Sequence, residues 1–238
     1  MATFVLVHGA FQGGWVWQET ADLLRAHGHE VHTPTFAGCG YLWQEMQPKD
    51  DLNTYVNGLL RYLEFEDLND IILVAHSFSG MICAAVMMRV PDRIQQALFV
   101  DAVIPEAHLS FAEIAGEGFR QILEKHRLEE WQVRPWPLQV FGVAESSADW
   151  LQSRLRPFPY HAFCTPFPET FDPAALSVSY IGCQETVTPF IREMVAKAKG
   201  YNWPVLELRT GHCPMVTCPS DLTRAIRSLI TSDLTAQQ

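Results

Sequence analysis

The chain has 238 residues, of which 48% are hydrophobic and 18% are charged. This composition excludes a disordered chain and a coiled coil. The length allows one domain with a sizeable core and an additional segment outside that core. The formal net charge is −10 and no block of Lys and Arg occurs, which argues against nucleic acid or an anionic membrane as a partner and favours small neutral ligands.

The cysteines are scattered without a CxxC pair, at Cys39, Cys83, Cys164, Cys183, Cys213 and Cys218. We expect all six to be reduced, as in a cytoplasmic protein. The chain enters a predicted strand by Thr3, which leaves no room for a signal peptide, and no apolar run is long enough to span a membrane. We therefore expect a cytoplasmic protein without a membrane partner, and we expect neither a metal ion nor a cofactor.

The first half of the chain alternates predicted strands with predicted helices. Short apolar runs predict strands at residues 3–7, 30–36, 71–74 and 97–100. Apolar side chains at helical spacing, or in one case apolar all round, predict helices over residues 15–26, 51–65 and 81–90.

Residues 105–172 break this alternation, because they contain no clean strand but several tryptophans, a proline cluster and a helical stretch over 111–127. The alternation then resumes with a strand, a helix, a strand and a closing helix at 175–183, 189–199, 204–208 and 220–230. Strands that alternate with helices pair in parallel through right-handed crossovers. We predict an α/β protein with a doubly wound, mostly parallel six-stranded sheet from residues 1–104 and 173–238, and an inserted, mainly helical lid at 105–172.

The segment 71–80, which reads IILVAHSFSG, joins the third predicted strand to a helix through Ser77. A strand that turns into a helix through small-x-Ser-x-small is typical of a nucleophile elbow, where a strained turn exposes the serine hydroxyl. Ala75 and Ser79 replace the two glycines of the strict pattern. Since serine is also a preferred helix N-cap, the segment alone leaves a capping role for Ser77 open.

Ligands of open α/β sheets lie beyond the carboxyl ends of the strands, where this chain places several polar residues. A serine nucleophile needs a histidine base, and the base needs a carboxylate that orients it. We predict that Ser77, His212 and Glu185 form this triad, in the chain order expected for this architecture. Asp101, which ends the fourth predicted strand, is the rival of Glu185.

An acyl transfer also needs N–H donors for the developing oxyanion, and these generally follow the nucleophile and the first strand. The residues at those positions are Phe78 and Ala10. We expect His8 and His76 to be structural. The residues that we predict to line the substrate pocket are Phe11, Trp131, Trp136 and Met215.

Four motifs carry a family resemblance: VHGAFQGGWVW at 7–17, HSFSGM at 76–81, YIGCQE at 180–185 and GHCPM at 211–215. With them the chain resembles the α/β-hydrolase superfamily, in the branch of small plant methyl esterases and hydroxynitrile lyases with related bacterial esterases. The resemblance implies a six-stranded sheet, Ser77 as nucleophile, His212 as base, and Ala10 with Phe78 as oxyanion hole.

The chain also departs from this family's pattern. The family usually has Asp a residue or so beyond Glu185, where this chain has Thr186. Lyase members carry Thr at the position of Gly9 and Lys at that of Cys213, so these two residues favour hydrolysis over cyanohydrin cleavage.

We therefore expect a serine hydrolase that cleaves a small, largely apolar carboxylic ester, of the methyl ester or lactone type, through an acyl-enzyme. One alternative is a small-molecule receptor on the same fold with little or no turnover. Another is a hydroxynitrile lyase or a carbon–carbon bond hydrolase that uses the same triad. The sequence leaves a homodimer open.

Overall fold

The computed structural model describes residues 1–174 and 177–235, with side chains described as far as residue 230. Six strands form one parallel sheet in the order β2-β1-β3-β4-β8-β9. Their bounds are β1 Thr3–Val7, β2 Glu30–His32, β3 Ile71–His76, β4 Ile94–Val100, β8 Val178–Cys183 and β9 Val205–Leu208. The predicted doubly wound, six-stranded α/β fold is confirmed.

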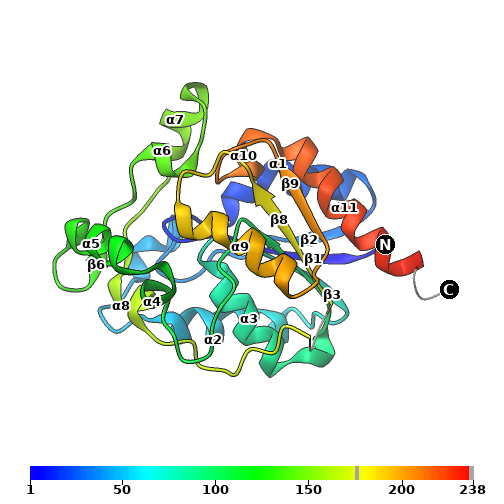
Figure 1. Ribbon diagram of the computed structural model, residues 1–238, viewed down its shortest axis with the longest axis horizontal. Helices are drawn as coiled ribbons and strands as arrows, with labels where there is room; N and C mark the ends of the chain where they lie inside the picture. The colour runs from blue at the N-terminus through cyan, green and yellow to red at the C-terminus, as the bar shows by residue number, and fades with distance from the viewer. Residues whose placement is uncertain (175–176, 236–238) are drawn as a thin grey trace.

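Helices cover both faces of this sheet (Figure 1). α1 packs against α11 on one face, and α2 packs against α3 on the other. The bounds of the helices outside the insertion are α1 Gln18–Ala26, α2 Leu52–Phe65, α3 Ser79–Arg89, α9 Pro189–Gly200, α10 Pro214–Thr217 and α11 Pro219–Thr235, with short 3-10 turns η1 Gly14–Trp17, η2 Gly40–Glu45 and η3 Pro91–Arg93. None of the helices in residues 1–174 and 177–235 is both long and apolar enough to cross a bilayer.

Two predicted elements are shorter than expected. β2 ends at His32 because Pro34 has no N–H to donate to a neighbouring strand, and the Thr35 hydroxyl instead accepts a hydrogen bond from the Gly14 N–H at 2.9 Å. The helix predicted over residues 111–127 is divided at Gly116, whose φ of +80° is in the left-handed region that glycine adopts most easily. Part of the strand predicted at 175–183, residues 175–176, lies outside the described residues.

The chain between β4 and β8 forms an insertion of short elements. Its helices are α4 Phe111–Ala115, α5 Glu117–Lys125, α6 Leu138–Phe141, α7 Glu145–Gln152 and α8 Tyr160–Cys164. We expected no clean strand in this segment, and it holds only two-residue strands, β5 Arg127–Leu128, β6 Gln132–Val133 and β7 Phe158–Pro159, which form a small antiparallel sheet. Such two-residue strands are too short to produce an alternating sequence pattern.

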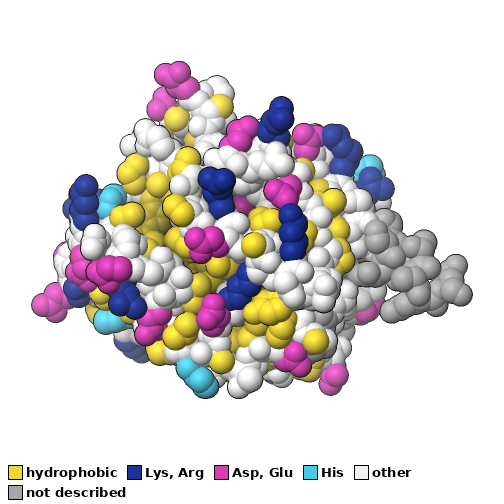
Figure 2. Space-filling view, in the orientation of Figure 1, with side chains coloured by type: hydrophobic (Ala, Val, Ile, Leu, Met, Phe, Trp, Pro, Cys, Tyr) yellow, Lys and Arg dark blue, Asp and Glu magenta, His cyan; other side chains and the backbone are white. Residues whose placement is uncertain are grey.

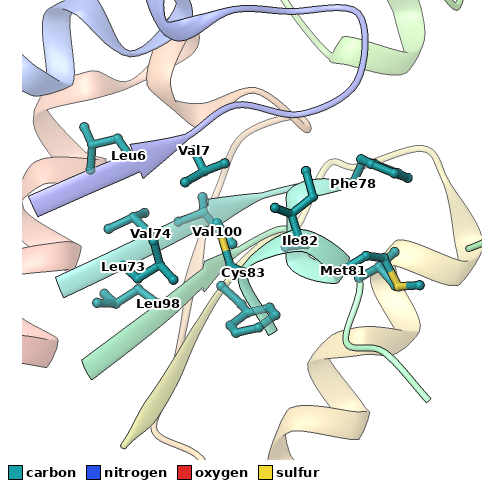
Figure 3. Close-up of a cluster of buried hydrophobic side chains, with 14 of the residues drawn as sticks. Leu6, Val7, Leu73, Val74, Phe78, Met81, Ile82, Cys83, Leu98 and Val100 are labelled. Carbon is teal, nitrogen blue, oxygen red and sulfur yellow. The ribbon is translucent and has the colours of Figure 1, made fainter. Parts of the chain in front are cut away.

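The core lies between the central strands and α3, directly behind the turn that carries Ser77. Every residue of β3 is buried, and α3 is buried from Ser79 to Met87. Figure 3 shows side chains of β1, β3 and β4 gathered with those of α3, among them Leu6, Val7, Leu73, Val74, Ile82, Cys83, Leu98 and Val100. Each large apolar side chain contributes about 1.5–3 kcal/mol by burial, so this cluster holds the strand and the helix on either side of the turn in place.

Candidate active site

Ser77 lies on a tight, strained turn between β3 and α3. Its φ is +56°, a conformation that costs a non-glycine residue about 1–3 kcal/mol and that persists only where the surroundings enforce it. The Val103 N–H donates to the Ser77 carbonyl at 3.1 Å. The buried Ser79 hydroxyl accepts a hydrogen bond from the His76 N–H at 2.8 Å and lies 2.9 Å from the Val7 carbonyl. Ser79 replaces a glycine of the strict elbow pattern, and its hydroxyl also links the turn to the end of β1.

His212 reaches Ser77 from the loop between β9 and α10. Its Nε2 lies 2.9 Å from the Ser77 Oγ. The loop is held from two sides: the His76 Nε2 donates to the His212 carbonyl at 2.8 Å, and the Cys213 N–H donates to the Phe141 carbonyl at 3.1 Å. The structure thus brings together the predicted nucleophile and the predicted base, and the insertion contributes to the position of the base.

The carboxylate that meets His212 belongs to Asp101, so the prediction that Glu185 orients the histidine is wrong. The Asp101 Oδ2 lies 2.7 Å from the His212 Nδ1, and Asp101 is completely buried. Glu185 is exposed, and its backbone N–H donates to the Thr210 carbonyl. The physical reason is that β4 and β8 are neighbours in the sheet, so the end of β4 takes the place beside His212 while the loop after β8 turns the Glu185 side chain to solvent.

Thr186 is a partner of the carboxylate that the sequence analysis missed. Its buried hydroxyl donates to the Asp101 Oδ2, and the Cys183 N–H donates to the Asp101 Oδ1 at 3.0 Å. With the His212 Nδ1, three hydrogen-bond partners therefore meet the oxygens of this buried carboxylate. The position of Thr186, where the resembling family usually has Asp, was the available signal that this residue belongs to the site.

The two predicted oxyanion donors lie beside Ser77. Among the described residues, neither the Ala10 N–H nor the Phe78 N–H has a hydrogen-bond acceptor. The loop after β1 approaches the nucleophile so closely that a Cβ on Gly9 would lie 3.0 Å from the Ser77 Cβ. The Gln12 Oε1 accepts from the Gly9 N–H at 3.2 Å and steadies this loop. Two free backbone donors next to a nucleophile can bind a developing oxyanion.

A cavity of about 300 Å³ opens onto Ser77 and His212. Figure 2 shows yellow hydrophobic side chains lining a hollow between the regions of α5, α6 and α9. Phe11 and Trp136 line this cavity, with their rings 5.0 Å apart between centroids. The pocket prediction is wrong for Trp131, which lies between β5 and β6, and for Met215, which is buried in α10 and borders a separate surface pocket beside Trp15.

With this geometry established, the chain can be compared with known proteins. A family model described as "Alpha/beta hydrolase family" matches residues 4–226. The chain belongs to the alpha/beta hydrolase family. A relative named "Carbendazim hydrolyzing esterase" from Nocardioides sp. (strain SG-4G) is 30% identical over 246 residues, which cover 96% of this chain and 100% of that protein.

Two plant proteins match this α/β-hydrolase over less than half of their length. "Salicylic acid-binding protein 2" of Nicotiana tabacum is 35% identical over 44% of this chain and 40% of that protein, and "Methyl jasmonate esterase 1" of Vitis vinifera is 31% identical over 48% and 44%. An extracellular α/β-hydrolase from a Paenibacillus species shares the fold, with a TM-score of 0.81 at 24% identity over 96% of this chain and 99% of that one. The resemblance to the methylesterase-like branch and its bacterial relatives is confirmed.

Two further histidines of this α/β-hydrolase are buried behind the site. Burial lowers the pKa of His8 to about 4, although its hydrogen bond with the Gly9 carbonyl opposes this effect. Burial also places the pKa of His76 well below its ordinary value, and the nearby His212 lowers it further. Both imidazoles are therefore neutral near pH 7.

These shifted pKa values predict that the folded hydrolase loses stability in mild acid. The unfolded chain binds a proton at His8 near pH 6.5 and the folded chain only near pH 4, so the free energy of unfolding falls as the pH drops below 6.5. We expect His8 alone to account for a loss of about 1.4 kcal/mol between pH 7.5 and pH 5.5. Urea unfolding at both pH values measures this loss.

The variant His8→Gln should show a smaller loss of stability between the two pH values, whatever its stability at pH 7.5. His161→Gln is the matched control because His161 is exposed. If His8→Gln kept the full pH dependence of the wild type, the folded-state pKa of His8 would not be depressed.

The cysteines near the site offer no second nucleophile. All six cysteines are free, and burial raises the pKa of the Cys213 thiol to about 12 and that of Cys183 still further. A thiol with such a pKa carries almost no thiolate near neutral pH. Within the part of the chain that the structure describes, no group of three His, Cys, Asp or Glu side chains is arranged to hold a metal ion.

Proposed function

We propose that this α/β-hydrolase is a carboxylic ester hydrolase that cleaves small, largely apolar esters, of the methyl ester or lactone type, through Ser77, His212 and Asp101. The observation that supports it best is the unbroken row of hydrogen bonds from the Ser77 Oγ through both nitrogens of His212 to the Asp101 carboxylate, with 2.9 Å and 2.7 Å between the successive heavy atoms. A serine, a histidine and a buried carboxylate in this order are the parts that acyl transfer requires.

The reaction begins with the proton on the His212 Nδ1, where Asp101 accepts its hydrogen bond. The Nε2 then takes the Ser77 proton while the Oγ attacks the ester carbonyl carbon, and the N–H groups of Ala10 and Phe78 bind the resulting oxyanion. Collapse of this intermediate breaks the bond to the alkoxy oxygen, which leaves as the alcohol with the proton from Nε2. His212 then takes a proton from a water molecule that attacks the acyl carbonyl, and when the second intermediate collapses the acid leaves and the Ser77 Oγ takes this proton back from Nε2.

The insertion acts as the lid of this site. It supplies most of the aromatic wall of the cavity, with Phe111, Phe119 and Trp136, while Phe190 of α9 closes the wall from the core side. Such a wall binds the apolar part of an ester and excludes water from the reacting carbonyl.

The crowded surroundings of Gly9 favour hydrolysis over the lyase reaction. A Cβ there would lie 3.1 Å from the His76 Nδ1, in addition to its close approach to Ser77, so the threonine of lyase members would displace its neighbours. The contact between nucleophile and base also disfavours a receptor without turnover, because a binding protein has no need of an aligned proton acceptor at Ser77.

The proposed function is tested with p-nitrophenyl acetate and butyrate, a fluorophosphonate probe, and a panel of methyl esters, lactones and carbendazim, the compound in the name of the Nocardioides relative. We expect ester turnover, and one covalent adduct per chain that tandem mass spectrometry maps to Ser77. Ser77→Ala is the control and should neither turn over nor label. A folded wild-type protein that neither labels nor hydrolyses any ester would contradict the proposal.

A further inference from the structure

One helix presents a line of side chains to the cavity that ends in polar groups. Phe119, Ile122 and His126 follow each other at positions i, i+3 and i+7, so they lie on one face of α5 and of its C-cap residue, His126. Lys125, the last residue of α5, lines the cavity beside them. The lining along α5 therefore changes from aromatic to cationic toward the C-terminal end of the helix.

The charge of the cavity is opposite to that of the protein. The chain has a net charge of −10, yet the residues that line the cavity include Lys125 and no Asp or Glu. Two exposed or half-buried arginines of α5 and β5 are paired: Arg120 with Glu117, and Arg127 with Glu124 at 3.3 Å. Lys125 forms no ion pair within the described residues, so its charge is not offset by a bound carboxylate.

The pKa of His126 is also affected by the positive charges in this region. Partial burial lowers its pKa below the ordinary value, and the charges of Arg134 and Lys125 lower it further, against an opposing hydrogen bond with the Pro135 carbonyl. The imidazole also packs with the edge of Trp136, at 5.2 Å between ring centroids. A neutral histidine among cations can donate an N–H to an anion, and the anion would relieve the repulsion that depresses its pKa.

We propose that Lys125 and His126 bind an anionic group of the substrate, so that the hydrolase takes the half-ester of an apolar dicarboxylic acid. This inference rests on the proposed function and specifies its substrate class. The aromatic wall contacts the body of the acid, the scissile ester reaches Ser77, and the free carboxylate lies against Lys125. A cavity of 300 Å³ has room for about ten groups of the size of water, which matches a benzene ring with two carboxyl groups.

Two methyl esters that differ only in the group para to the ester test this inference. Monomethyl terephthalate carries the free carboxylate, and methyl 4-methylbenzoate has a methyl group in its place. We expect the ratio of their kcat/KM values, anionic over neutral, to fall about 5-fold in Lys125→Gln, which corresponds to the ~1 kcal/mol of a solvent-exposed ion pair. In Lys125→Glu the ratio should fall further, and most of the change should be in the KM of the anionic ester.

Arg120→Gln is the matched control, because it removes the same charge from the same helix at an exposed position outside the cavity lining. A ratio that changed less than 2-fold in both Lys125 variants, or as much in Arg120→Gln, would overturn the assignment. Calorimetric binding of monomethyl terephthalate to Ser77→Ala, with and without Lys125→Gln, tests the same contact without turnover. Affinity that depends on Lys125 there would support the anion site even if the wild type hydrolysed neither ester, a result that would count against the proposed function alone.

Discussion

Replacing Asp101 with asparagine is expected to lower kcat for ester hydrolysis by about 10⁴-fold while leaving the fold intact. The Cys183 N–H donates to the Oδ1 of this side chain, so an asparagine would keep its oxygen there and turn its NH₂ group toward His212. The His212 Nδ1 would then have to accept a hydrogen bond, and its proton would move to Nε2. An imidazole in that tautomer cannot take the proton of Ser77.

Glu185→Gln is the matched control, because it makes the same chemical change on an exposed carboxylate. We expect its kcat to stay within about 2-fold of the wild type, as is usual for a surface residue without contacts to the site. Both variants are compared by steady-state kinetics, with circular dichroism to verify folding. If Glu185→Gln lost its activity while Asp101→Asn kept it, the carboxylate that orients His212 would be Glu185, in the loop after β8, and not Asp101.

Gly80→Ala is expected to reduce both the free energy of unfolding and the activity. A Cβ at position 80 would lie 2.0 Å from the Val103 carbonyl oxygen, which belongs to backbone and cannot rotate away. We expect a cost of about 3 kcal/mol in urea unfolding, at the upper end of the range for overpacked sites. Since the Val103 N–H holds the Ser77 carbonyl, a displaced Val103 should also lower kcat in the variant molecules that remain folded.

Gly118→Ala supplies the control with the opposite sign. Gly118 lies within α5, and apart from its chain neighbours and the backbone of that helix no atom lies within 4 Å of the place where its Cβ would be. There the methyl group should stabilise the helix by about 0.5–1 kcal/mol. If both alanine variants were equally stable, the close approach of α3 to the chain after β4 would not constrain the fold.

The meeting of Ser77 with His212, the proposed nucleophile and base, could be predicted from the sequence because each residue has a local signal. Ser77 follows a strand that begins with a fully apolar run and has small residues on either side, and His212 follows a late strand after Gly211. Six parallel strands follow from the alternation of apolar runs with helical spacing, since that pattern is enforced by burial on both faces of the sheet.

The acid could not be chosen from local signals, because Asp101 and Glu185 both follow strands. β4 and β8 are neighbours, and the side chain that follows either strand could meet His212. Which of the two does so depends on the direction of each side chain, and no spacing in the sequence encodes that direction. The prediction of the pocket residues was partly wrong for a related reason. Trp131 and Trp136 are both tryptophans, and only the path of the insertion places Trp136 and not Trp131 at the cavity. Chain path within an irregular insertion leaves no periodic trace.

Ser77 and Asp101 come from neighbouring parts of the chain, and this affects which residues of the enzyme can be altered. Ser77 lies between β3 and α3 and Asp101 directly follows β4, so the proposed nucleophile and acid belong to one contiguous strand–helix–strand segment. The tip of the loop after β8, where Gln184, Glu185 and Val187 are exposed, therefore has no part in the proposed reaction. It becomes a site where residues can be exchanged, or a tag or probe attached, within reach of the active centre, provided that the buried Thr186 is kept.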